Sequence, residues 1–172
     1  MRFNGIGKIV AAGMAAIVML AAPGSIRAQG VDTVLKAADT QKLLPARVFY
    51  RGQSANTEMR NAGGVKFADG YYVLATLVDT SGYSTGLAVK YQAYFIAEVP
   101  LNVGGQSLPA GVYGVGFVGD KFVVTDVGAH DVLTVAAGDD PAQMHPMPLQ
   151  VKADPAGGFR LYAGRKYVSF NR

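Results

Sequence analysis

The stretch that decides the fold runs from residue 108 to residue 127 and reads Leu-Pro-Ala-Gly-Val-Tyr-Gly-Val-Gly-Phe-Val-Gly-Asp-Lys-Phe-Val-Val-Thr-Asp-Val. Two runs rich in β-branched and aromatic residues flank Gly119-Asp120. A two-residue loop with glycine first is typical of a type II′ turn between antiparallel strands. The stretch therefore predicts a β-hairpin in which Val118 faces Lys121.

Counting outward from this turn predicts which side chains share a face. One face carries large apolar side chains and has a carboxylate at its far end. Its facing pairs are Phe117–Phe122, Val115–Val124 and Tyr113–Asp126. The other face has Gly114 and Gly116 where side chains are expected. Glycine inside a strand costs roughly 0.5–1 kcal/mol relative to alanine, so these positions need a reason. We expect an aromatic ring to lie over them, and the alternative is that they leave room for a ligand.

The carboxylate on the aromatic face also needs a partner. Because an unpaired buried carboxylate is costly, we expect Asp126 to accept a hydrogen bond from the Tyr113 hydroxyl or from a backbone N–H of a neighbouring loop. Tyr113, Gly114, Gly116 and Asp126 are therefore candidate ligand-binding residues of this hairpin.

The rest of the chain repeats the hairpin pattern at short intervals. Strands are expected at residues 47–51, 65–68, 71–79, 91–103, 132–137, 149–153, 159–163 and 166–170. Two-residue turns at Asp69-Gly70, of type I′, at Gly104-Gly105 and at Gly164-Arg165 predict three facing pairs, which are Phe67–Tyr72, Leu101–Leu108 and Tyr162–Tyr167. Residues 52–64 have no clear period and are interpreted as a loop that contains at most one helical turn or a short strand. Asp32 and Pro45 bracket a short helix over residues 32–44, which lies against the β-structure or forms a loosely held arm. About nine short strands predict a single all-β domain over residues 29–172, an antiparallel sandwich or barrel.

Residues 1–28 have the pattern of a secretion signal. Arg2 and Lys8 precede an uninterrupted apolar run over residues 9–22, and Ala28 supplies the small residue at which a signal peptidase cleaves. The run is shorter than the roughly 20 residues of a membrane-spanning helix. We expect cleavage before Gln29, export to the periplasm or the medium, and no transmembrane segment afterwards.

Without that signal the chain is nearly neutral. The formal net charge of +4 comes from 16 Lys and Arg against 12 Asp and Glu, and three of those 16 lie in residues 1–28. The remaining basic residues are scattered apart from Arg165-Lys166, so there is no basic stripe for nucleic acid. The chain has no cysteine, so neither a disulfide nor a lipid-modified cysteine is available to it.

The strand entry Pro109-Ala110-Gly111-Val112-Tyr113 resembles the Pro-Ala-Gly-x-Tyr entry of certain exported bacterial β-sandwich proteins. The whole of residues 29–172 also resembles an uncharacterised family of small exported bacterial proteins. The resemblance implies a β-sandwich and export. The family carries no activity, so it assigns no catalytic residue.

The familiar catalytic patterns are missing from the sequence. It has no cysteine nucleophile, no Gly-x-Ser-x-Gly elbow, no phosphate-binding glycine loop between a strand and a helix, and only two histidines. We therefore expect no enzyme activity and no cofactor.

One loop carries a candidate metal site, Met144-His145-Pro146-Met147. Thioether and imidazole ligands suit Cu(I), and His-x-Met is similar to part of the motif of periplasmic copper chaperones. Val112 and Val123 stand where the other ligands of that motif would fall. The alternative is a proline-stiffened loop whose methionines cover the edge of the core.

Tyrosines offer a further candidate site. Tyr162 and Tyr167 are expected to be exposed together beside Arg160, where a sugar could stack on the rings. An eight-stranded outer-membrane barrel is another interpretation, but most strands are shorter than the 9–11 residues it needs.

These patterns together predict an exported, non-catalytic module that binds a small molecule or an envelope protein. The alternatives are a structural or envelope-associated protein without a small ligand, and a periplasmic copper-binding protein. A ligand-binding module should contain an enclosed apolar pocket with few convergent polar groups. A structural protein should have a filled core with an exposed apolar patch or a free sheet edge.

Overall fold

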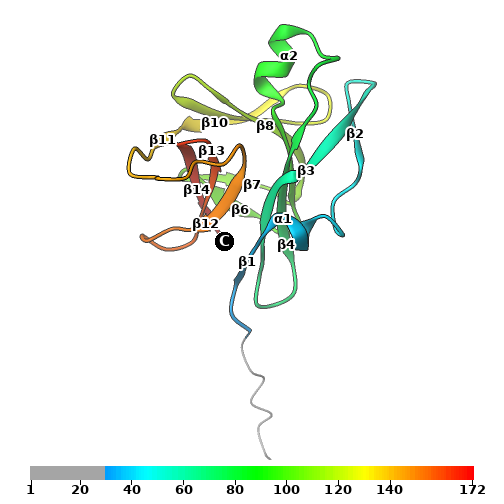
Figure 1. Cartoon of the computed structure of the whole chain (residues 1–172). Helices are drawn as coiled ribbons and strands as arrows, with labels where there is room; N and C mark the ends of the chain where they lie inside the picture. The colour runs from blue at the N-terminus through cyan, green and yellow to red at the C-terminus, as the bar shows by residue number, and fades with distance from the viewer. Residues whose placement is uncertain (1–29) are drawn as a thin grey trace, which may run out of the picture.

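The computed structural model describes residues 30–172, so the predicted secretion signal and its cleavage site lie outside the described residues. Within that range the chain forms antiparallel strands in two facing sheets, with two short helices (Figure 1). Both sheets are open, which makes the domain a β-sandwich rather than a closed barrel.

The larger sheet contains eight strands. Seven follow one another across it in the order β1 (Thr33–Leu35), β3 (Gln53–Lys66), β4 (Tyr72–Val78), β5 (Ala93–Ala97), β8 (Gly111–Val118), β9 (Lys121–Thr125) and β10 (Asp131–Ala136). The eighth, β2 (Arg47–Tyr50), pairs with the first half of β3. The two helices are α1 (Ala37–Thr40), which contacts β3, and α2 (Thr85–Lys90), which contacts β8 and β9.

The smaller sheet is built mainly from the end of the chain. Its strand order is β12 (Gln150–Ala153), β13 (Phe159–Ala163), β14 (Lys166–Asn171), β6 (Leu101–Val103) and β7 (Gln106–Leu108), and β11 (Gly138–Asp139) pairs with β14. The chain passes from the larger sheet to the smaller one at Pro100, between β5 and β6, and returns between β7 and β8. The expected long strand over residues 91–103 is therefore two strands in different sheets, because proline ends the ladder at that point.

The central hairpin has the predicted register. Val118 pairs with Lys121, Phe117 with Phe122 and Val115 with Val124. Gly119 has a φ of 64° and Asp120 has no positive φ, as a type II′ turn requires. The predicted pairs Leu101–Leu108 and Tyr162–Tyr167 are also confirmed.

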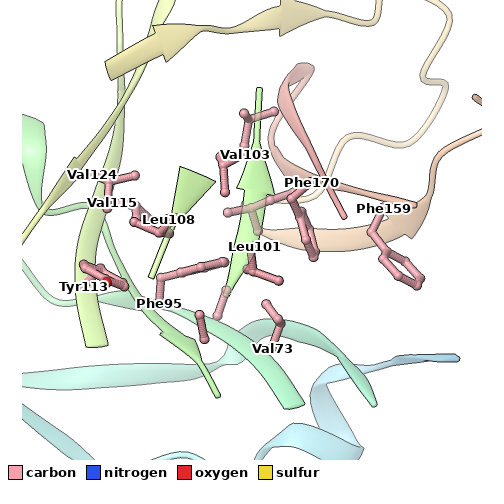
Figure 2. Close-up of a cluster of buried hydrophobic side chains, with 14 of the residues drawn as sticks. Val73, Phe95, Leu101, Val103, Leu108, Tyr113, Val115, Val124, Phe159 and Phe170 are labelled. Atoms are coloured by element: carbon pink, nitrogen blue, oxygen red, sulfur yellow. The ribbon is translucent and has the colours of Figure 1, made fainter. Parts of the chain in front are cut away.

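The core lies between the sheets, where alternate side chains of both inner faces meet (Figure 2). Phe95 and Phe170 approach from opposite sheets, edge to face, with ring centroids 6.3 Å apart. Fully burying one such side chain stabilises the fold by roughly 1.5–3 kcal/mol. The members labelled in Figure 2 are Val73, Phe95, Leu101, Val103, Leu108, Tyr113, Val115, Val124, Phe159 and Phe170.

Two expectations for the first half of the chain are wrong. Residues 52–64 are not a loop with at most a short strand, because they form most of the 14-residue strand β3. Residues 32–44 are not one helix, because they contain the short strand β1 and the single-turn helix α1. In both places pairing with neighbouring strands outweighs local preference.

The predicted type I′ turn at Asp69-Gly70 is also wrong. Phe67 faces Tyr71 through a 2.8 Å backbone hydrogen bond, and Lys66, not Phe67, pairs with Tyr72. The loop is therefore one residue longer, and Gly70 takes the left-handed conformation with a φ of 97°. This is the three-residue hairpin loop that closes with a glycine.

Candidate ligand-binding site

An apolar hollow of about 470 Å³, which we call the α1 groove, lies between the β1–α1 segment and the end of the loop that leads into β12. Leu35 and Ala38 form one wall, Met147 and Leu149 form the other, and Ala62 of β3 lies between them. Figure 1 shows β12 beside β1 and β3, the edge at which the groove is located. The groove therefore lies where the edges of the two sheets meet.

The sequence builds this edge through one close contact between backbones. Gly63 of β3 lies against β12, where an added Cβ would be only 3.0 Å from the backbone nitrogen of Val151. A side chain at residue 63 would push the two sheets apart. On the other side of β3, Leu35 pairs with Gly64, so β1 is fixed to the same strand.

The β1–α1 segment packs against a small buried cluster of its own. Leu44, Ala62 and Leu74 form a small buried cluster, against which Leu35 packs. The buried hydroxyl of Thr40 donates to the carbonyl of Ala37 at 3.0 Å and so closes the single helical turn. The groove is therefore bounded by secondary structure and a small core of its own.

Two polar residues, Gln150 and Lys36, are part of this lining. Gln150 pairs with Tyr162, so its side chain lies on the face of β12 opposite to that of the buried Val151. Its amide nitrogen Nε2 is buried and has no hydrogen-bond partner among residues 30–172. Lys36 is exposed and is the one charged residue of the groove lining. An apolar pocket of this size with few polar groups is the usual form of a small-molecule site.

A second hollow, of about 430 Å³, lies over the smaller sheet beside Tyr162, Arg160 and Lys152. The expected pairing of Tyr162 with Tyr167 is present, with ring centroids 5.4 Å apart. The expected exposure is wrong, because Tyr162 is only 3% exposed. Its hydroxyl donates a hydrogen bond to Asp140 at 3.0 Å. This bond explains why tyrosine, which has a polar tip, is tolerated at a buried position.

The ring faces at this second hollow are already in use. The Arg160 guanidinium carbon lies 4.2 Å from the Tyr167 centroid, and Lys152 Nζ lies 5.4 Å from that of Tyr162. Cations over aromatic faces are favourable contacts in themselves. The arrangement is a side-chain network that leaves little open ring surface for a sugar.

Asp154 anchors that network. Its Oδ2 accepts a 2.6 Å hydrogen bond from the Ser169 hydroxyl and lies 3.0 Å from Arg160 Nε, although that N–H does not point directly at it. Burial alone would raise the pKa of Asp154, but the hydrogen bond from Ser169 and the contact with Arg160 hold it below its usual value. The carboxylate therefore stays charged and stabilises the folded state.

The candidate copper ligands do not share one hollow. Met144 and His145 lie beside the second hollow, and Met147 lies in the α1 groove. Met144 is 83% exposed, so it does not cover the core edge. Among the residues that the structure describes, no group of three or more His, Asp or Glu side chains is close enough to hold a metal ion.

The hairpin glycines are covered rather than open. An added Cβ at Gly114 would lie 1.5 Å from the Tyr91 ring, which confirms the expected aromatic cover. At Gly116 the cover is different, because the backbone carbonyls of Val89 and Lys90 in α2 would lie 2.7 Å away. Neither position leaves space for a ligand.

The other two hairpin candidates are also engaged within the fold. The Tyr113 hydroxyl donates to the carbonyl of Pro109 at 2.9 Å, so the expected bond to Asp126 is absent. Asp126 lies beyond the end of β9, in a turn. It accepts backbone N–H bonds from Gly128 and His130 at 2.8 and 2.9 Å, which confirms the alternative of a backbone partner. These hydrogen bonds lower the pKa of Asp126, and the one from the His130 backbone N–H contributes most.

A tyrosine cluster under α2 escapes sequence analysis altogether. Tyr50 and Tyr91 stack with ring centroids 4.0 Å apart, and Tyr83 packs at an angle to both. The hydroxyls of Tyr83 and Tyr91 are buried without a hydrogen-bond partner in the described part of the chain, and burial raises the pKa of Tyr91 strongly. Tyr83 and Tyr91 lie on either side of α2, whereas Tyr50 comes from β2, so no local pattern indicates that the three meet.

The α1 groove was missed for the same reason. Its two walls come from residues 34–38 and 147–151, more than a hundred positions apart. Among its residues only Met147 is a candidate from the sequence, and there it is a candidate metal ligand.

Comparison with known proteins adds no assignment. No protein-family model matches the chain, and no curated protein or solved structure does. Neither helix in residues 30–172 is long and apolar enough to cross a membrane.

Proposed function

We propose that this protein is a non-catalytic binding module that holds a small apolar molecule in the α1 groove. The observation that carries the proposal is an apolar hollow of about 470 Å³ whose lining contains one charged residue, Lys36. Ligand pockets typically have volumes of about 300–1,000 Å³ and are lined mainly by apolar side chains.

The composition of the lining supports a ligand. A ligand in the groove would replace water beside apolar side chains such as Leu35 and Met147, which is favourable. The groove thus gives an apolar driving force, and the charge of Lys36 gives one point of orientation.

Export is part of the same proposal. The pattern of residues 1–28 supports secretion, and the cysteine-free chain needs no oxidising partner to fold. A module of this kind in the periplasm or the medium would carry or sense a poorly soluble molecule outside the cytoplasm.

The test is a fluorescence titration with N-phenyl-1-naphthylamine, a neutral apolar probe. Ala38 is exposed at the groove, so Ala38→Trp should obstruct the groove without disturbing the core. Ala142 is exposed at the second hollow, so Ala142→Trp is the matched control. We expect saturable binding to the wild type and to Ala142→Trp, and at least tenfold weaker binding to Ala38→Trp.

Two results would overturn this proposal. One is a probe affinity that Ala38→Trp leaves unchanged. The other is loss of binding in Ala142→Trp alone, which would assign the ligand to the second hollow.

A second candidate function is interaction with an envelope protein, and Phe49 favours it. This side chain is 70% exposed on β2, and no strand other than β3 pairs with β2 among residues 30–172. A free edge beside an exposed aromatic ring is a feature of protein-binding surfaces. Photo-cross-linking from residue 49 in the native host should then capture one defined partner, whereas cross-linking from exposed Lys42 should not.

A further inference from the structure

We propose that the ligand of the α1 groove is a single-chain amphiphile with a carboxylate head group, bound with its head at Lys36 and its chain along the apolar walls. This inference rests on the proposed function and adds the chemical class of the ligand.

The charge of the groove lining carries the first step. Of the residues that line it, Lys36 alone is charged, and the others are apolar or neutral. Lys36 forms no ion pair with any Asp or Glu in the described range. A ligand with a negative head group therefore gains an opposite charge at this site, whereas a cationic one meets repulsion.

The nearest carboxylate in sequence does not compete for that ammonium group. Asp39 turns back to the start of α1, where its Oδ2 accepts the backbone N–H of Lys36 at 3.2 Å. This is ordinary capping of a helix start. This hydrogen bond engages the Asp39 carboxylate, so the Lys36 ammonium group remains available to a ligand.

The second step comes from the chemistry of the Lys36 head. An ammonium group has three donors and no acceptor, and a carboxylate is an acceptor only, so the two are complementary. An alcohol has one oxygen and no charge, so it gains less from the same ammonium group.

The third step concerns the tail. Leu149, Val151 and Ala62 are buried within the fold but still border the hollow, and Met147 offers a flexible thioether side chain on the rim. An unbranched chain gains affinity from each methylene that it buries there, about fourfold per group by the usual transfer free energy. Flexible methionine surfaces accommodate such chains without a fixed shape.

The experiment measures displacement of N-phenyl-1-naphthylamine by dodecanoate, dodecanol and dodecylammonium, each at concentrations where it stays monomeric. Lys36→Glu reverses the charge at the groove. Lys42→Glu, on the same segment but outside the groove lining, is the matched control.

We expect the wild type to bind dodecanoate about fivefold or more tightly than dodecanol, and dodecylammonium most weakly. Lys36→Glu should reverse the order of the two charged amphiphiles, whereas Lys42→Glu should keep it. Raising the salt concentration should reduce the preference for dodecanoate over dodecanol, because the ion pair between Lys36 and the carboxylate lies at the surface. In the series from octanoate to dodecanoate, affinity should rise about fourfold per methylene until the groove is full.

The possible failures are distinguishable. Equal binding of all three amphiphiles, unchanged in Lys36→Glu, would overturn the carboxylate assignment and leave the apolar site in place. Absence of binding by all three and by the probe would overturn the proposed function itself. Dodecanoate binding that persists in Ala38→Trp would place the carboxylate elsewhere and overturn this inference.

Discussion

Gly114 has no side chain because the Tyr91 ring occupies the place where one would lie. That ring stacks on Tyr50 and packs against Tyr83, so it has little freedom to move aside. The two glycines of the central hairpin are therefore explained by packing, and the ligand alternative for them is no longer needed. The stability cost of glycine in a strand is offset by the burial of three aromatic rings.

Gly114→Ala is expected to destabilise the protein. An alanine Cβ at this position would lie 1.5 Å from Tyr91 Cδ2, so the stacked rings must shift, at a cost of about 1–3 kcal/mol for overpacking. Gly82→Ala is the control, because an added Cβ there meets nothing within 4 Å. Urea unfolding monitored by circular dichroism gives both free energies, and equal stability of the two variants would contradict the aromatic cover.

Asp154 should make stability depend on pH in the acid range. Its pKa in the folded state is lowered, so its contribution is fully present above the unfolded-state value of about 3.9 and is lost as the pH falls through the lower folded-state value. Asp154→Asn should cost about 1–3 kcal/mol at pH 7, because hydrogen bonds to a charged group are lost. The difference from wild type should shrink below about pH 4.

The control for Asp154 is an acidic residue in a more exposed ion pair. Asp69 lies 2.7 Å from Arg172, with both side chains more than 40% exposed. Such surface pairs contribute little to stability, so Asp69→Asn should stay close to wild type at pH 7. A stability difference between Asp154→Asn and wild type that is independent of pH would show that the lost contact is not an ionic one.

At the scale of single elements, the turns decided which predictions succeeded. Gly119-Asp120 and Gly164-Arg165 fix the register of the strands beside them, and both hairpins have the predicted pairs. Asp69-Gly70 does not give the predicted register, because the same dipeptide also fits the end of a three-residue loop. The β2–β3 turn was missed because Arg51 takes the left-handed conformation, with a φ of 50°, in a place where arginine gives no signal.

That unfavourable turn residue leads to a prediction for the β2–β3 hairpin. Arg51 and Gly52 both have positive φ, as in a type I′ turn, for which Asn-Gly is the preferred pair. Arg51→Asn should therefore stabilise the protein by roughly 0.5 kcal/mol, since asparagine tolerates this conformation better. Gly52→Ala should destabilise it, because the strained φ then falls on a residue with a Cβ. Thermal unfolding of the pair measures both, and destabilisation by Arg51→Asn would contradict this turn assignment.

β3 shows the limit of local patterns at this scale. Its sequence is polar and small over residues 52–64, yet it pairs with β2 and β4 and carries a register shift between Glu58 and Ala62. Strand formation here depends on partners on both sides rather than on the residues themselves. The same irregularity precedes Ala62, which borders the α1 groove.

At the scale of the whole molecule, the fold class was predictable and the candidate site was not. Hairpins are made of neighbours in sequence, so alternation and turn residues indicate them. The α1 groove joins residues 34–38 to residues 147–151, and the tyrosine cluster under α2 joins Tyr50 to residues 83 and 91. The Asp154 network joins consecutive strands, but its side-chain contacts have no sequence motif. Their only local signals, a tyrosine or a methionine on a strand or loop, are equally typical of ordinary packing.

The most direct test of the α1 groove is a ¹H–¹⁵N NMR titration of the isotopically labelled protein with dodecanoate. We expect the backbone amide shifts to cluster at residues 34–38 and 147–151, which line the groove. Shifts that cluster instead around Arg160 and Tyr162, or the absence of any shift at saturation, would contradict the α1 groove as the binding site.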